Sequence, residues 1–322
     1  MTQTVFSIDW LSLTVWADDN VLDEVLNALG YNARVLKPTP KGGGRGFRRV
    51  SEGDHGFRLY EVPVTESKEG SVDYWSIELP GQACAWVGLE RIIDAMSIIM
   101  DKAGRWNCTR IDAAFDTQAF EVEQFWDVVS TPDGDFKSYV HRDNIERWYN
   151  ASGTGDTVYM GAAGSMSRLR VYKKQIEDSE VFGAEFFTRA ELVVRRDRAS
   201  ALLAKLMSIP LEDWAEKCMG LLRGFVDLGA DWWQNWLQGV DQFRISFQQP
   251  TPTIDKVQGW LHSQVAPSLA AWIKARHPGG ETESILRDIL ALYKEGSSRH
   301  TQKHIGMIEN YQRHVQVGMA YG

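Results

Sequence analysis

The sequence predicts an α+β fold, in which a mainly antiparallel sheet with flanking helices is followed by a helical C-terminal region. Two observations predict it. Alternating apolar and polar residues dominate the first two thirds of the 322-residue chain, whereas apolar residues at helical spacing dominate beyond about residue 198. Hydrophobic residues make up 43% of the chain, which is enough to bury a sizeable core. We therefore expect two parts, with the sheet in residues 1–205 and the helices in residues 206–322.

The strands are predicted from period-two alternation. It is clearest in VFSIDWLSLTV at 5–15 and in SVDYWSIEL at 71–79, where every second side chain would face a core. Pro250 follows the last strand and would end it, because proline has no N–H to donate to a neighbouring strand. Further strands are expected at 106–117, 156–161, 167–174, 184–196 and 243–249.

The helices are predicted from apolar residues spaced three and four apart. LERIIDAMSIIM at 89–100 shows this amphipathic pattern. A shorter helix is expected at 20–29, with Asp19 as its N-cap and Gly30 as its stop. Further helices are expected at 198–208, 211–227, 253–276, 281–295 and 298–315.

The chain is acidic overall, but one segment is basic. A formal net charge of −8 argues against a general polyanion binder, because neutralising phosphates requires an excess of Lys and Arg. Residues 31–60 hold such an excess, opposed by Glu52 and Asp54. The basic residues of this segment are Arg34, Lys37, Lys41, Arg45, Arg48, Arg49 and Arg58. A local basic surface can therefore exist on an acidic protein.

Several classes of protein are not indicated. No stretch approaches the roughly 20 apolar residues of a membrane-spanning helix, and the N-terminus lacks the pattern of a secretion signal. We therefore expect a cytoplasmic protein with no membrane partner. Cys84, Cys108 and Cys218 are odd in number and far apart, which predicts buried thiols rather than disulfides. The run PKGGGRG at 40–46 lacks the Gly-Lys-Ser/Thr of a nucleotide-binding phosphate loop.

Three of the predicted strands carry a polar face. In TRIDAAFDT, alternation places Arg110, Asp112 and Asp116 on one face and apolar residues on the other. The same rule groups Arg168, Arg170, Tyr172 and Lys174, and then Arg189, Glu191 and Arg195. Carboxylates, basic groups and a tyrosine suit metal-assisted phosphoryl transfer, in which Mg²⁺ or Mn²⁺ takes oxygen ligands and cationic side chains stabilise the transition state. A solvated strand face is the alternative interpretation.

The order of these motifs resembles the trans-acting replication (Rep_trans) initiators of phages and plasmids. Members typically show an Arg-x-Asp strand, a turn with Gly and Ser, Tyr-x-Lys-x-x-Glu, and an Arg-x-Glu strand. The matching segments are DWLSLTV (9–15), GGGRGFRRV (42–50), IELPGQAC (77–84), TRIDAAFDT (109–117), VYMGAAGSMSRLRVYKKQIE (158–177) and RAELVVRRDRA (189–199). The chain departs from the common pattern at Lys173, where an acidic residue is usual, and at Ala162-Ala163, where Ser-Arg is frequent.

The resemblance implies an enzyme that nicks and rejoins single-stranded or locally melted origin DNA through a tyrosyl 5′-phosphate, leaving a 3′-hydroxyl. Tyr172, Lys174 and Glu177 fall on the Tyr-x-Lys-x-x-Glu motif, so Tyr172 is the candidate nucleophile and Lys174 its catalytic partner. A phenol with a pKa of about 10 needs such help to lose its proton. Tyr159 is the rival nucleophile, ranked lower because no Lys-x-x-Glu follows it.

The resemblance also implies a cation site. The expected ligands of Mg²⁺ or Mn²⁺ are Asp112, Asp116 and Glu191, with Glu78 as a weaker candidate. The concentrated basic charge of PKGGGRGFRRV at 40–50 predicts DNA contacts there, with a flexible hairpin connection as the alternative. The expected DNA-binding residues are Arg45, Arg48, Arg49, Arg110, Arg168 and Arg170. Residues 1–205 would form the nicking domain, and residues 206–322 would bind DNA or mediate dimerisation. A host helicase and a homodimer are the partners that the family implies.

Two other functions fit the same residues. One is a non-catalytic DNA-binding regulator with the initiator fold, and the other is a metal-dependent nuclease that uses water as its nucleophile. HTQKH at 300–304 lacks a third metal ligand and is interpreted as a solvated helix face. Trp232, Trp233 and Trp236 could stack on bases, although a place in the core is the expected one.

Overall fold

The fold is described from a computed structural model of the chain. The residues that the structure describes are 4–40, 43–63, 74–149, 156–175, 186–245, 257–258, 261–300, 305 and 308. The chain divides into two compact units, Met1–Phe247 and Gln248–Gly322. In the described part of the chain, no helix is long and apolar enough to span a bilayer.

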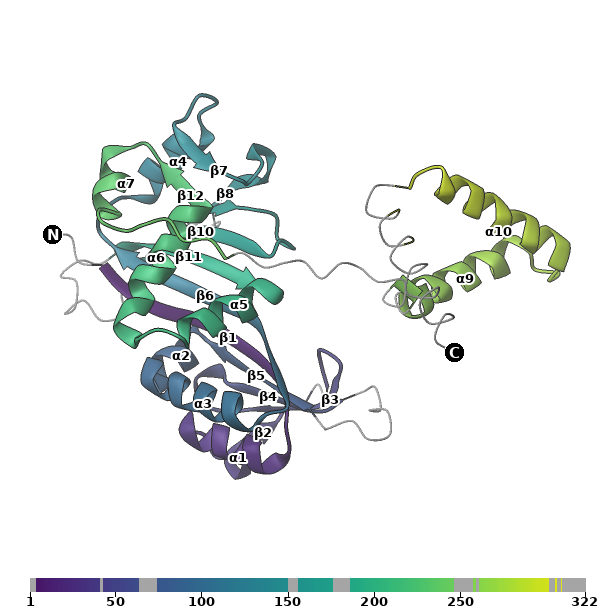
Figure 1. Cartoon of the computed structure of the whole chain (residues 1–322), viewed down its shortest axis with the longest axis horizontal. Coiled ribbons are helices and arrows are strands. Elements are labelled where there is room, and N and C mark those ends of the chain that lie inside the picture. Colours follow the sequence, from purple (N-terminus) through teal and green to yellow (C-terminus); the bar gives the residue numbers. More distant parts are fainter. Residues whose placement is uncertain are drawn as a thin grey trace, which may run out of the picture. The chain divides into compact units, whose positions relative to one another are not determined.

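Among the described residues, an antiparallel sheet of ten strands organises the first unit, in the order β2-β3-β4-β5-β1-β6-β11-β10-β9-β8 (Figure 1). The expectation of a mainly antiparallel sheet is confirmed. Its strands are β1 (Thr4–Trp16), β2 (Lys37–Pro38), β3 (Phe47–Glu52), β4 (Arg58–Pro63), β5 (Tyr74–Pro80), β6 (Arg105–Thr117), β8 (Ile145–Tyr149), β9 (Asp156–Met160), β10 (Ser167–Gln175) and β11 (Phe186–Arg195). A separate two-stranded sheet pairs β7 (Phe136–Ser138) with β12 (Val226–Leu228).

Helices lie over one face of the large sheet (Figure 1). Those of the first unit are α1 (Asp19–Ala28), α2 (Gly81–Val87), α3 (Leu89–Lys102), α4 (Val122–Ser130), α5 (Asp197–Leu206), α6 (Trp214–Phe225) and α7 (Asp231–Trp236). Short 3-10 turns lie at Ala33–Val35, Asp54–Gly56, Arg142–Asn144 and Leu211–Asp213. The second unit contains a π-helical segment, Leu261–Val265, followed by α9 (Ala266–Arg276) and α10 (Thr282–Ser297).

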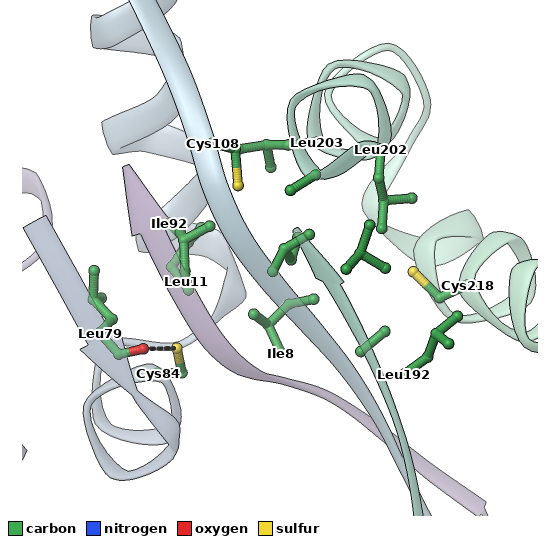
Figure 2. Close-up of a cluster of buried hydrophobic side chains, with 14 of the residues drawn as sticks. Ile8, Leu11, Leu79, Cys84, Ile92, Cys108, Leu192, Leu202, Leu203 and Cys218 are labelled. Carbon is green, nitrogen blue, oxygen red and sulfur yellow. Dashed lines mark hydrogen bonds between the residues drawn. The ribbon is translucent and has the colours of Figure 1, made fainter. Parts of the chain in front are cut away.

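Alternation along the central strands separates an apolar face from a polar face. On the apolar face, Leu11 of β1, Ile111 of β6 and Leu192 of β11 are almost completely buried against the helices. Figure 2 shows side chains of this core, among them Leu202 and Leu203 of α5. About 25 cal/mol is gained for each Å² of apolar surface removed from water, so this face supplies most of the drive for folding. The opposite, polar face holds the residues predicted to carry chemistry.

The three cysteines belong to the apolar core, as the sequence predicts. Cys84, Cys108 and Cys218 are buried and are not joined in disulfides. The thiol of Cys84 donates to the Leu79 carbonyl at 3.3 Å (Figure 2). Burial raises the pKa of all three thiols, in the case of Cys218 to about 12. These cysteines therefore act as small apolar side chains.

Most of the predicted elements are present, and their boundaries show what fixes them. The first helix is capped by Asp18 rather than Asp19, since the Asp18 carboxylate accepts from the Val21 N–H at 3.0 Å. It stops at Gly30, which takes a positive φ of 84° that few other residues tolerate. The helix expected over 211–227 ends at Phe225, because the next residues pair with β7 as β12.

The strand expected at 243–249 is wrong for its described part. Residues 243–245 are not a strand, and residues 246–249 lie outside the described residues. The Phe243 N–H donates to the Gly220 carbonyl of α6 at 2.8 Å, so this segment lies along a helix instead of joining a sheet. Of the helices expected at 253–276 and 298–315, only parts fall within the described residues.

The first compact unit ends at Phe247, later than the expected boundary near residue 205. The reason is that α6 and α7 complete its core: Cys218, Leu222 and Trp233 are fully buried within it. The described residues 206–245 therefore pack with the sheet, and Gln248–Gly322 forms the second unit.

Candidate active site

Strand pairing brings the three predicted polar strands together. The order of the sheet places β11 between β6 and β10. Glu191 of β11 lies opposite Arg170 of β10, and Arg189 lies opposite both Asp116 of β6 and Tyr172 of β10. Side chains of paired residues lie on the same face of a sheet, so these groups meet on the polar face.

Asp112 and Glu191 form a buried pair of carboxyl groups. Neither residue has any exposed surface. Arg110 donates from Nε and Nη2 to the Asp112 carboxylate, at 2.9 and 2.5 Å, and Arg170 forms an ion pair with Glu191. Burial raises the pKa of Glu191, and the neighbouring negative charge of Asp112 raises it further, against the opposing effect of Arg170. The raised pKa of Glu191 means that its negative charge is disfavoured there, which a bound proton or cation would offset.

Tyr172 lies beside this pair. Its hydroxyl donates to Oε2 of Glu191 at 3.2 Å, and part of its side chain is exposed. Burial raises the pKa of the Tyr172 phenol, and the charge of Glu191 adds to that shift, while Arg189 and Arg170 oppose it. The phenol is therefore protonated in the resting protein, with a carboxylate in position to accept its proton.

Asp116 is held by an arginine, away from the Asp112–Glu191 pair. Arg189 donates from Nε and Nη2 to the Asp116 carboxylate, at 2.5 and 2.6 Å, and from Nη1 to Asp9 at 2.5 Å. The Arg189 side chain is only 5% exposed. Burial lowers the pKa of Lys174 and the charge of Arg189 lowers it further, so Lys174 lies in the field of this cluster.

Glu78 belongs to a third group of charges. It lies on β5, separated from β6 by β1, and its carboxylate pairs with Arg45 and Arg58 and accepts from the Tyr60 hydroxyl at 3.5 Å. Within the described residues, no three His, Cys, Asp or Glu side chains are placed to hold one metal ion. Of the four expected ligands, the structure therefore brings together only Asp112 and Glu191.

The predicted DNA-binding arginines occupy two places. Arg110, Arg168 and Arg170 lie on the polar face, where the Arg168 guanidinium stacks over the Tyr159 ring at 4.1 Å. Arg45, Arg48 and Arg49 lie around the hairpin that leads into β3, where Arg49 pairs with Glu61 at 2.7 Å.

The glycine-rich segment before β3 is a tight turn. Arg45 and Gly46 both take positive φ, 55° and 88°, as a two-residue hairpin turn requires. Gly44 and Phe47 exchange backbone hydrogen bonds of 2.9 and 3.0 Å across it. The turn projects Arg45 toward Glu78, with which it forms an ion pair.

Two residues of the site were not expected from the sequence. Asp9 lies at a bulge of β1, between Ile8 and Trp10, and this bulge is what allows it to reach Arg189. Trp10 lies under the Arg110 guanidinium, 4.2 Å from its ring centre. An acidic residue within an otherwise alternating apolar strand is the only sequence signal for the bulge.

Other sequence candidates lie elsewhere. Trp233 is fully buried, and Trp232 and Trp236 pack around Phe120 with ring centroids at 4.9 and 5.1 Å. These tryptophans are part of the core, as expected. Glu177 and the second histidine of HTQKH, at position 304, lie outside the described residues.

The fold and the site define a class of protein: an antiparallel sheet whose polar face combines a tyrosine, paired carboxyl groups and arginines. The model of one family, the Rep_trans replication initiation factors, matches residues 106–290, which is more than half of the chain. The chain belongs to this family.

A solved structure supports the fold. The chain is similar to the rolling-circle replication initiator protein from Geobacillus stearothermophilus, with 21% identity and a TM-score of 0.56. The similarity covers 77% of this chain and 100% of that chain. No protein with a curated description matches the sequence.

Proposed function

We propose that this replication initiation factor nicks and rejoins one strand of origin DNA through a 5′-phosphotyrosyl link to Tyr172. One observation carries the proposal: the Tyr172 hydroxyl lies 3.2 Å from Oε2 of Glu191 on the polar face. This geometry pairs a candidate nucleophile with a base, within the hydrogen-bond reach that general base catalysis requires. Membership of the Rep_trans family supports the same chemistry.

The reaction exchanges one phosphodiester for another, so the energy of the broken bond is kept in the phosphotyrosyl link. The phenol oxygen of Tyr172 forms a bond to the backbone phosphorus while its proton passes to Glu191, and the bond from phosphorus to the 3′ oxygen breaks. The leaving oxygen takes up a proton and becomes the 3′-hydroxyl. Arg170 and Lys174 supply positive charge for the phosphorane-like transition state. Attack by a 3′-hydroxyl on the phosphotyrosine reverses the reaction, so rejoining needs no ATP.

A divalent cation fits the Asp112–Glu191 pair. Mg²⁺ is commonly bound by one or two carboxylates together with substrate phosphates and water, and the two facing carboxyl groups offer that donor set. When bound, Mg²⁺ or Mn²⁺ would polarise a phosphate oxygen. All four carboxylates have arginine partners, but only Asp112 and Glu191 adjoin each other. Asp116 and Glu78 lie in separate clusters, so we assign them to positioning Arg189 and to holding the hairpin turn at Arg45.

Origin DNA, single-stranded or locally melted, is the proposed substrate. Arg168 and Arg170 line the polar face beside Tyr172, and the hairpin with Arg48 and Arg49 provides further phosphate contacts. A host helicase and a second copy of the chain are proposed partners. Because residues 206–245 pack with the sheet, the proposed accessory role falls mainly to the second unit.

The deciding experiment compares Tyr172→Phe with Tyr159→Phe. Purified protein is incubated with labelled single-stranded origin oligonucleotides and Mg²⁺ or Mn²⁺, and peptides are searched for the mass of a nucleotide adduct. The wild type and Tyr159→Phe should form the adduct, whereas Tyr172→Phe should bind DNA and form none. An adduct in Tyr172→Phe contradicts the assignment. Cleavage without any adduct identifies a water-using nuclease, and binding without cleavage identifies a non-catalytic regulator.

A further inference from the structure

A cavity of about 560 Å³ opens on the first unit, away from the Tyr172 site. It lies between α6, the two-stranded sheet of β7 and β12, and the segment 241–245. Two of its lining residues, Ser167 and Leu192, belong to the apolar side of the large sheet, so the cavity and the polar face are on opposite sides. Its volume lies in the range of small-molecule sites, about 300–1,000 Å³.

One wall of the cavity depends on two glycines. Gly220 and Gly224 stand one turn apart on α6, where the segment 241–245 passes. A Cβ at Gly220 would lie 2.5 Å from the Asp241 carbonyl oxygen, and one at Gly224 would lie 2.4 Å from that of Phe243. No other residue permits this approach, so the wall is fixed by sequence.

The lining carries an excess of positive charge. Lys137, Arg198, Arg223 and Arg244 line the cavity, and Asp227 is the acidic residue among them. Asp227 is already paired with Arg223 at 3.5 Å and accepts from Gln242 at 3.0 Å. Lys137 and Arg244 are exposed, and no carboxylate in the described part of the chain forms an ion pair with either. In a chain with a net charge of −8, this excess favours an anion such as a phosphate.

Aromatic rings stand beside these cations. Tyr139 is 60% exposed, and its ring is held edge-on to Phe225, with centroids 5.0 Å apart. The Arg198 guanidinium donates to the Tyr139 hydroxyl and to Ser167, both at 3.1 Å. The Tyr139 ring is thus fixed in place yet accessible, as a stacking platform for a planar base must be.

We propose that this cavity binds one nucleotide unit, with its base against Tyr139 and its phosphate among Lys137, Arg198 and Arg244. The unit is either a free nucleoside phosphate or one nucleotide of a DNA strand, since the recognised chemistry is the same. Neither source requires Tyr172, so the site is independent of the proposed nicking reaction.

Isothermal titration calorimetry of the full chain tests the site. The probes are dAMP, deoxyadenosine, inorganic phosphate and a short single-stranded deoxyadenosine oligonucleotide. Arg244→Glu should weaken dAMP binding about tenfold, the loss expected for one charge-assisted contact. Tyr139→Ala should weaken it by a similar factor, and Tyr139→Phe, which keeps the ring, should restore it. Deoxyadenosine and phosphate alone should each bind more weakly than dAMP.

Lys205→Glu is the matched control, because Lys205 is an exposed lysine on α5 that does not line the cavity. If Arg244→Glu and Tyr139→Ala weaken the oligonucleotide as well as dAMP, the cavity takes a nucleotide of a strand; if they weaken dAMP alone, it takes a free nucleotide. The proposal is overturned if neither dAMP nor the oligonucleotide binds more weakly to Arg244→Glu and Tyr139→Ala. It is also overturned if Lys205→Glu weakens binding by as much as these two variants do. Tyr172→Phe should bind dAMP as the wild type does, which separates failure of this site from failure of the nicking assignment.

Discussion

The Tyr172 hydroxyl donates to Oε2 of Glu191 across the paired strands β10 and β11, at 3.2 Å. Burial is the main cause that raises the pKa of both groups. A tyrosine with a raised pKa makes little phenolate at neutral pH, so attack on phosphorus requires a base that takes the proton as the new bond forms. Glu191 is the carboxylate placed to do so.

The first prediction concerns pH. Glu191 accepts a proton only when ionised, and its raised pKa means that the ionised fraction falls at a higher pH than for an ordinary glutamate. The rate of adduct formation should therefore fall as the pH drops through a midpoint above the ordinary value of about 4.3. Glu191→Gln should slow the reaction about 10²–10⁴-fold and remove this midpoint. Quenched-flow assays across pH measure both.

Glu90→Gln serves as the control, since Glu90 is exposed on α3. Its pH profile should match that of the wild type. If Glu191→Gln keeps the acidic midpoint, the base is another group.

The second prediction concerns the Asp116–Arg189–Asp9 cluster. Asp116→Asn leaves the buried Arg189 charge with fewer partners, and breaking a buried ion pair typically costs about 3–5 kcal/mol. Asp9 still pairs with Arg189 in this variant, so we expect the unfolding free energy to fall by an amount at the lower end of that range, about 3 kcal/mol. Urea denaturation followed by tryptophan fluorescence gives the value.

A comparison with the Arg49–Glu61 pair sharpens this test. The Arg49 side chain is 56% exposed, so Glu61→Gln should cost less than about 1 kcal/mol. Equal losses in the two variants would show that the Arg189 cluster is not held as the structure describes.

The third prediction concerns the cation. A ligand that binds only the folded state stabilises it by about 2.7 kcal/mol at a hundred times its Kd, so Mg²⁺ or Mn²⁺ should raise the melting temperature of the wild type. Asp112→Asn should abolish this rise, because it removes one of the two facing carboxylates. Glu78→Gln should keep it, since Glu78 lies on β5, separated by β1 from the strand that carries Asp112. Differential scanning calorimetry with and without each cation measures the rise. If Glu78→Gln abolishes the rise and Asp112→Asn keeps it, the cation binds at Glu78.

The long central strands were predictable, whereas the short elements were not. β1, β6 and β11 alternate over ten or more residues, so period two is clear in each. β3 and β4 carry charged residues beside a glycine-rich turn, and that composition also describes a loop. The segment at 243–245 alternates like a strand, but the glycines of α6 hold it against a helix. Tertiary packing against α6 therefore determines the structure of residues 243–245, and such packing leaves no pattern in the local sequence.

The polar face was predictable, but the partners within it were not. Alternation put Asp112, Asp116 and Glu191 on one face, and the structure agrees. It could not show that Arg189 holds Asp116, because cross-strand partners depend on register. The role of Asp9 could not be predicted from the sequence, for a related reason. Strict alternation groups it with buried Leu11, and only the bulge between Ile8 and Trp10 turns it toward Arg189.

The last prediction concerns the cysteines. Cys84, Cys108 and Cys218 are buried, and burial raises the pKa of each thiol, so at pH 8 almost none of the reactive thiolate is present. Ellman's reagent should therefore label none of the three in the folded protein and all three in urea. The labelling rate in intermediate urea should follow unfolding of the core that Figure 2 shows, because each thiol reacts only once that core opens. Rapid labelling of any one cysteine without denaturant would place that residue at the surface and contradict its position in the core.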